Sequence, residues 1–200
     1  SAPTSIGIFN AIRVTNNFIN GNNNIKDIHV AISGVGKVGS KLAKLLAEAG
    51  VRITASSINL ELINELKKEI KIMEVSPANL FKTACDIISP CALGGVINAS
   101  TRDLLKCKAI VGAANNQLDN SETGEWLLKN NIVYSPDYLV NSGGVIAIAS
   151  EINKTENLLE KQLEKIGDRL KLVLAESKKS GESTDSVVRR IAWERINSFE

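Results

Sequence analysis

Residues that bind metals or form disulfides are scarce in this sequence, which has one histidine and three cysteines among 200 residues. Cys85, Cys91 and Cys107 are odd in number and lack the spacing of zinc ligands, so we expect no metal site. Because unpaired cysteines are typical of reducing compartments, we expect a cytoplasmic protein.

Long apolar runs are also missing. No stretch approaches the roughly 20 apolar residues that span a bilayer, so we expect no membrane segment. The start, Ser1 to Thr4, has neither a basic region nor an apolar core and does not predict a secretory signal. It also lacks an initiator methionine, as expected if the numbering begins inside a longer protein.

No excess of one charge sign is present. Lysine and arginine total 24 against 22 aspartate and glutamate residues, for a net charge of +2, and no basic run stands out. Nucleic acid and anionic membranes are therefore not expected partners.

Hydrophobic residues make up 44% of the chain, which suits one compact domain. Helical spacing predicts a first helix over 4–19. Strands and helices then alternate. Strands are predicted at 28–33, 51–55, 71–75, 86–89, 109–113 and 132–135, and helices at 38–49, 62–70, from 76, at 100–105 and at 122–129. Six strands in two βαβαβ halves indicate an α/β fold with a doubly wound parallel sheet.

Beyond Val145 no further strand is predicted. A long helix begins near Leu159 and stops at Gly181, and a last helix begins near Thr184. We expect a single domain over 1–200, with its core at about 25–145 and a helical tail at 146–200. The tail either packs back onto the sheet or reaches toward another domain.

A glycine-rich motif lies between the first predicted strand of the sheet and the helix that follows it. Its residues are Gly34, Val35, Gly36, Lys37, Val38 and Gly39. Gly34 permits a tight turn, Gly36 leaves room for a pyrophosphate, and Gly39 allows close packing of helix and strand. The helix N-terminus offers free N–H groups to phosphates. A glycine turn without a ligand is the alternative, but the strand-to-helix context favours a dinucleotide.

The motif also predicts an acidic residue about 20 positions later, to accept hydrogen bonds from the adenosine ribose. Ser57 stands in that place. A hydroxyl can still bind the ribose, and it does not repel a 2′-phosphate, but no Lys or Arg closely follows Ser57. The choice between NAD and NADP therefore stays open.

Three further loops follow predicted strands and contain small and polar residues, at 89–95, 112–117 and 137–144. Asn and Gly are common in ordinary turns, yet three such loops at one sheet edge favour a ligand. Cys91 has no activating base nearby and is interpreted as a packed cysteine. His29, inside a strand, is interpreted as structural.

Four motifs, in this order, resemble the cofactor-binding domain of the glutamate/leucine/phenylalanine/valine dehydrogenases, especially their leucine-type branch. They are VAISGVGKVG at 30–39, CDIISPCALGG at 85–95, GAANNQL at 112–118 and YSPDYLVNSGGV at 134–145. The resemblance implies a Rossmann NAD(P)-binding fold with flanking N- and C-terminal helices. It also implies reversible oxidation of a hydrophobic L-amino acid to the 2-oxo acid and ammonia, with hydride passing to the nicotinamide.

The resemblance further implies roles for individual residues. Thr4 resembles the threonine that touches the nicotinamide amide, and the three glycines would carry the pyrophosphate. Cys91 and Ala92 resemble the loop that lies along the cofactor.

The remaining implied roles belong to the nicotinamide end. Asn116, with Asn115 beside it, would contact the cofactor ribose or nicotinamide. Asn141 would lie near nicotinamide and substrate, and Val145 would line the substrate pocket.

Two departures from the family pattern matter. Leucine-type members usually carry Asp where this chain has Ser57. They also have an N-terminal domain with catalytic lysines and an aspartate, for which this chain has no matching segment. We therefore expect no catalytic residue in this chain, which would bind cofactor without turning over an amino acid. The full-length enzyme is expected to be a homo-oligomer.

Two other functions stay open. A non-catalytic dinucleotide module or sensor would explain the missing carboxylate. A different oxidoreductase, acting on hydroxy acids, would need a histidine base, and only His29 is available.

Replacing Ser57 with Asp is predicted to strengthen NAD binding by about 1–2 kcal/mol, the scale of a hydrogen bond to a charged group. Calorimetric titration of both proteins with NAD measures this difference. Unchanged or weaker binding would mean that Ser57 does not face the ribose.

Overall fold

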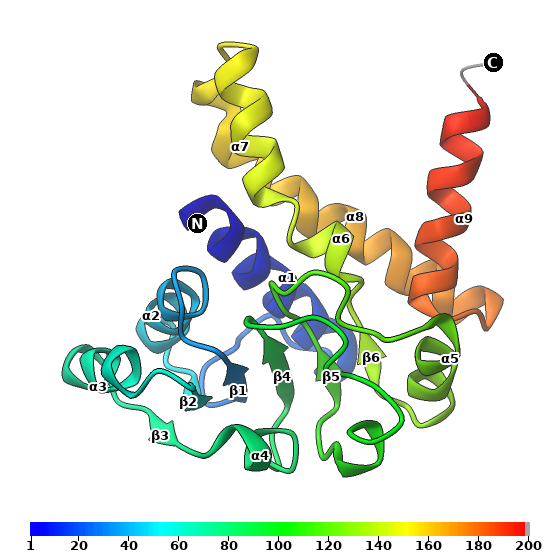
Figure 1. Ribbon diagram of the computed structural model, residues 1–200. Helices are drawn as coiled ribbons and strands as arrows, with labels where there is room; N and C mark the ends of the chain where they lie inside the picture. The colour runs from blue at the N-terminus through cyan, green and yellow to red at the C-terminus, as the bar shows by residue number, and fades with distance from the viewer. Residues whose placement is uncertain (199–200) are drawn as a thin grey trace.

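Six parallel strands form one sheet in the computed structural model, which describes residues 1–198 (Figure 1). The strands are β1 (His29–Ser33), β2 (Arg52–Ser56), β3 (Met73–Glu74), β4 (Ile87–Pro90), β5 (Ala109–Ile110) and β6 (Val133–Tyr134). Their order in the sheet is β3-β2-β1-β4-β5-β6. After β3 the chain crosses back to lie beside β1, so the predicted doubly wound sheet is confirmed.

Helices connect and flank the strands. The α-helices are α1 (Ala2–Asn20), α2 (Gly39–Glu48), α3 (Leu60–Glu69), α4 (Pro77–Leu80), α5 (Ser121–Lys129), α6 (Asp137–Val140), α7 (Gly143–Ile152), α8 (Leu159–Ser180) and α9 (Thr184–Asn197). Two short 3-10 turns, η1 (Arg102–Leu104) and η2 (Glu156–Leu158), complete the described elements.

Alternating residues of β1 divide the helices between the two faces of the sheet. Val30 and Ile32 pack in one hydrophobic cluster with residues of α1, α2, α3 and α8. Ala31 packs in another cluster with Leu80 of α4 on the opposite face. Because successive side chains of a strand point to opposite faces, this division gives three layers with the sheet in the middle.

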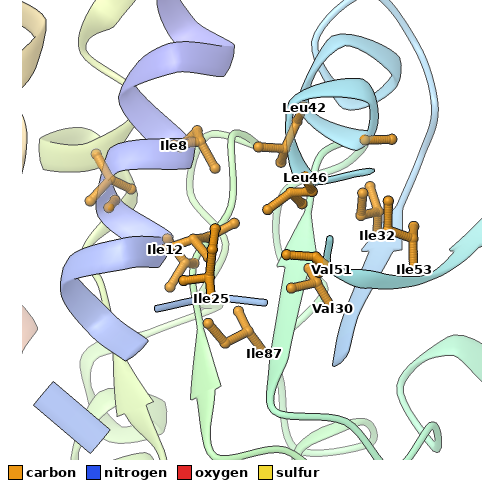
Figure 2. Close-up of a cluster of buried hydrophobic side chains, with 14 of the residues drawn as sticks. Ile8, Ile12, Ile25, Val30, Ile32, Leu42, Leu46, Val51, Ile53 and Ile87 are labelled. Carbon is orange, nitrogen blue, oxygen red and sulfur yellow. The ribbon is translucent and has the colours of Figure 1, made fainter. Parts of the chain in front are cut away.

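Helix α1 and the long helix α8 pack on the same face of the sheet. Figure 2 shows Ile8 and Ile12 of α1 close to Leu42 and Leu46 of α2, above the strands. Ile166 of α8 belongs to the same cluster and is fully buried. Part of the tail therefore packs back onto the domain, whereas α7 and α9 stand out from its body on the same side (Figure 1).

The helix predicted from Ser100 is wrong, because only Arg102–Leu104 form a 3-10 turn there. The Ser100 amide and hydroxyl both donate to Oδ1 of Asn98. The Thr101 hydroxyl donates to the carbonyl of Val96 at 2.6 Å. Since these side chains bind the nearby backbone, the segment folds as turns.

Other boundaries differ more mildly. Strands β3, β5 and β6 have only two residues each, fewer than the apolar runs predict. Helix α7 is not indicated by the sequence pattern, because Gly143 and Gly144 resemble a turn and the apolar residues after them have no polar face.

His29 is structural, as its place in β1 predicts. Its Nδ1 lies 3.1 Å from the Ala84 carbonyl oxygen and must donate to it, so in the neutral ring Nε2 accepts from the Thr54 hydroxyl at 2.8 Å. Burial lowers the pKa of His29 from 6.5, and the charge of Arg52 lowers it further, although Asp86 opposes this. The folded state therefore favours the neutral ring.

Stability is predicted to fall as the pH drops from about 7 toward 5. The unfolded chain takes up a proton on histidine near pH 6.5, before the folded chain does, so protonation favours unfolding in this window. His29→Gln, which leaves no histidine, should flatten the dependence in urea unfolding at several pH values.

Asp86 does not contribute in that range. Burial would raise the pKa of Asp86, but hydrogen bonds from Lys108 and from the His29 amide lower it, so the carboxylate stays charged. Equal pH dependence in the wild type and His29→Gln would contradict the assignment.

Candidate functional site

The carboxyl ends of β1 and β4 lie side by side where the strand order reverses. Ser33 pairs with Pro90, and the Cys91 amide donates to the Ser33 carbonyl at 2.8 Å. The glycine loop follows one strand and the loop from Cys91 follows the other. In open α/β sheets, ligands bind in the crevice at such a reversal.

Two glycines of the loop are needed for close packing. Gly34 has φ +95°, and a Cβ there would lie 2.6 Å from the Ala92 Cβ. A Cβ on Gly39 would overlap the Gly34 carbonyl oxygen. The Gly34 amide donates to the Ser56 carbonyl at 2.9 Å, which fixes the loop to the end of β2.

Gly36 differs from its two neighbours in the motif. A Cβ at Gly36 would meet nothing within 4 Å, so the missing side chain opens the surface. Among the hydrogen bonds of residues 1–198, none uses the backbone N–H groups of Val35, Gly36, Lys37 or Val38. These free donors stand before α2, and a helix N-terminus with free N–H groups is a ready binding site for a phosphate.

The asparagine loops meet beside this crevice. Asn141 Nδ2 donates to Asn115 Oδ1 at 2.6 Å, which joins the loop after β5 to the loop after α6. A Cβ on Gly94 would overlap the Asn115 carbonyl oxygen, so the loop after β4 also packs here. Asn116 adopts a left-handed conformation with φ 51°. The three loops are therefore in contact, as their common sheet edge predicts.

Asp137 holds this arrangement and is not indicated by sequence reasoning. It is 5% exposed. Its Oδ2 accepts from the Asn116 amide at 2.7 Å, and its Oδ1 accepts from the Tyr134 hydroxyl at 2.6 Å. Burial and the Asp137 charge raise the pKa of Tyr134, so the phenol remains a donor. The one available signal is an acidic residue three positions after the end of β6.

Thr4 lies in the first turn of α1, which also touches the glycine loop, because the Ser5 hydroxyl donates to the Val38 carbonyl at 3.1 Å. The first turn of α1 packs on the first turn of α7, where a Cβ on Gly143 would overlap the Pro3 carbonyl oxygen. A Cβ on Gly144 would lie 3.2 Å from Thr4 Oγ1. Thr4 therefore packs against the start of α7, which begins two residues after Asn141. Val145 is 71% exposed on α7, so no part of residues 1–198 encloses it.

Ser57 stands directly after β2. Its hydroxyl oxygen accepts from the Asn59 amide at 3.0 Å. It lines a pocket of about 600 Å³ at the carboxyl ends of β2 and β3. A separate hollow of about 760 Å³, which includes Glu48 and Met73, lies toward the amino ends of these strands and away from the glycine loop.

Cys91 is packed, as the sequence predicts. A Cβ on Gly39 would lie 3.3 Å from the Cys91 Cβ, and its sulfur lies 3.5 Å from the Ser89 hydroxyl. Burial raises the pKa of the Cys91 thiol, which disfavours the thiolate that a nucleophile needs.

Neither a metal-binding cluster nor a membrane-spanning helix is found among residues 1–198. Within residues 1–198 no three His, Cys, Asp or Glu side chains are grouped so as to hold a metal ion. None of the described helices is both long and apolar enough to cross a bilayer.

Comparison with known proteins decides the family. The profile of the Glutamate/Leucine/Phenylalanine/Valine dehydrogenase family matches residues 58–185, more than half of the chain. The chain belongs to this family. The resemblance drawn from the four motifs is thereby confirmed, and similarity to leucine and phenylalanine dehydrogenases supports the leucine dehydrogenase-like branch.

Individual relatives agree with this assignment. The chain is 40% identical to phenylalanine dehydrogenase from Thermoactinomyces intermedius, over 100% of the chain and 55% of the relative. It is 35% identical to leucine dehydrogenase from Bacillus cereus, again over 100% of the chain and 55% of the relative. The chain thus spans about half the length of the curated relatives it matches.

Solved structures show the same fold. L-tryptophan dehydrogenase from Nostoc punctiforme superposes with a TM-score of 0.95 and 35% identity, over 99% of this chain and 60% of that chain. A hetero-hexameric glutamate dehydrogenase from Thermus thermophilus superposes with a TM-score of 0.76 at 18% identity, over 98% of this chain and 52% of that chain. This second similarity supports the fold alone.

Gly36→Ala and Gly39→Ala are predicted to differ sharply in stability. The methyl group added at position 39 would overlap the backbone, and the shifts that relieve such overpacking lower the free energy of unfolding by about 1–3 kcal/mol. The methyl group at Gly36 enters open space and should leave the free energy of unfolding within about 1 kcal/mol of the wild type. Urea unfolding measures both, and equal losses would contradict the described loop.

Proposed function

We propose that this chain is the dinucleotide-binding domain, over 1–200, of an NAD(P)-dependent amino-acid dehydrogenase. The full enzyme converts a hydrophobic L-amino acid reversibly to its 2-oxo acid and ammonia. The observation that supports this proposal most directly is the glycine loop. There, Gly36 leaves open space before a helix N-terminus whose N–H groups make no hydrogen bond. Relatives named phenylalanine, leucine and L-tryptophan dehydrogenases support the substrate class.

The residues present fit the diphosphate of a dinucleotide. The amides of Val35, Gly36, Lys37 and Val38 would bind it, and the exposed Lys37 side chain adds a positive charge nearby. The absence of a side chain at Gly36 lets the ligand approach the backbone. Cys91 and Ala92, against the glycine loop, would border the middle of the dinucleotide.

The nicotinamide end would lie along the asparagine loops. Asn115, Asn116 and Asn141 offer amide donors and acceptors there. Thr4, packed against the start of α7, would contact the nicotinamide amide. When bound, NAD or NADP supplies the hydride acceptor. Val145 would border the substrate once another part of the enzyme covers it.

Proton transfer is assigned to other parts of the enzyme. Removing the substrate proton needs a base within about 3 Å, or one water away. Of the polar residues assigned to the nicotinamide end, Thr4 and the three asparagines do not act as bases. Since the chain spans 55% of its relatives, we place the catalytic groups in additional polypeptide. The complete enzyme is proposed to be a cytoplasmic homo-oligomer.

One observation favours a second function. Ser57 stands where a carboxylate is expected to bind the ribose, and this substitution suits a non-catalytic dinucleotide-binding or sensor module.

Titration of the purified chain with NAD and NADP tests coenzyme binding. Gly36→Ala should lower the affinity at least about tenfold, because a methyl group occupies the approach to the amides. Gly124→Ala is the matched control, since its Cβ makes an ordinary 3.5 Å contact away from the loop. Binding that neither substitution changes would contradict the proposed site.

The same chain tests whether the catalytic groups lie outside it. Mixed with NAD(P) and hydrophobic L-amino acids, it should give no amino-acid-dependent rise in reduced nicotinamide absorbance. A sustained rise would show that the catalytic groups lie within it, and would contradict the proposal.

A further inference from the structure

The pocket beside Ser57 brings together polar groups from three elements. Ser57 follows β2, Lys67 comes from α3, and Ser76 follows β3. The pocket holds about 600 Å³ and begins one residue after Ser56, whose carbonyl oxygen accepts from the Gly34 amide. A dinucleotide whose diphosphate lies at the glycine loop extends its adenosine toward the end of β2. The pocket therefore lies where the adenosine ribose would end.

The charge in this pocket is balanced and accessible. Glu74 is its only lining carboxylate, and Lys67 Nζ lies 2.8 Å from Glu74 Oε2. The two side chains are 43% and 34% exposed, and exposed ion pairs of this kind contribute little. A phosphate dianion, with more negative charge and three acceptor oxygens, can therefore compete with Glu74 for the ammonium group.

Both serine hydroxyls can donate. Ser57 Oγ accepts from the Asn59 amide, which leaves its own proton free. Ser76 precedes α4 without a side-chain capping bond, and its Oγ makes no hydrogen bond within residues 1–198. The pocket thus offers one cation and two hydroxyl donors, with no uncompensated carboxylate.

We propose that this pocket binds the 2′-phosphate of NADP. Lys67 is its cation, Ser57 and Ser76 are its hydroxyl donors, and Glu74 weakens phosphate binding by competing for Lys67. This inference rests on the proposed function, which it deepens by naming the groups that determine coenzyme choice. Lys67 is ten positions after Ser57 in sequence, but α3 and the side chain's reach bring it to the same pocket.

The test compares two ligands that differ only in the phosphate, 5′-AMP and adenosine 2′,5′-bisphosphate, by calorimetry on the 200-residue chain. The wild type should bind the bisphosphate at least as tightly as 5′-AMP. Lys67→Met should lower the affinity for the bisphosphate about tenfold or more, because a charge-assisted bond is lost, and should leave the affinity for 5′-AMP unchanged. Glu74→Gln should raise the affinity for the bisphosphate several-fold.

Lys68→Met is the matched control, since Lys68 neighbours Lys67 on α3 but does not line the pocket. Equal effects of Lys67→Met and Lys68→Met, or a wild type that binds 5′-AMP at least tenfold more tightly, would overturn the inference. NAD titrated alongside separates the two claims. NAD binding without a phosphate effect contradicts only this pocket, whereas failure of every nucleotide to bind contradicts the proposed function as well.

Discussion

Close packing of backbone against backbone, where β1 turns into α2, is the constraint on which the rest of the site depends. Gly39 sits against the Gly34 carbonyl, and Gly34 sits against Ala92 of the neighbouring loop. No side chain fits between these segments, so α2 starts directly above the end of β1. This places the free amides of 35–38 at the reversal of strand order, where helix N-terminus and crevice coincide.

A second set of contacts extends the site away from that junction. Asp137 receives hydrogen bonds from the Asn116 amide and the Tyr134 hydroxyl, and Asn141 donates to Asn115. The one-turn helix α6 is thus joined to the loop after β5 at both of its ends. Since a buried carboxylate is stable only with such partners, the network also explains why an acidic residue is tolerated in the interior.

Much of this could be predicted from the sequence, because local signals and fold agree at the glycine motif. The apolar run at 28–33 and the helix face after Gly39 leave little choice for a strand-to-helix turn. The six strands and their winding followed from alternation alone. Residues 100–105 show the limit, since Asn98 and Thr101 bind nearby backbone and prevent the predicted helix. Asp137 shows another limit, because its partner Asn116 is distant in sequence. Lys67 is missed for a different reason, because only the folding of α3 against β2 and β3 brings it to the pocket beside Ser57.

We propose above all that backbone amides at the start of α2 receive a diphosphate. Amide NMR spectra of the ¹⁵N-labelled chain, recorded during addition of ADP, test this most directly. We expect the largest shifts on the amides of Val35, Gly36, Lys37 and Val38. Saturable shifts confined to another surface, with these four amides unmoved, would contradict this proposal.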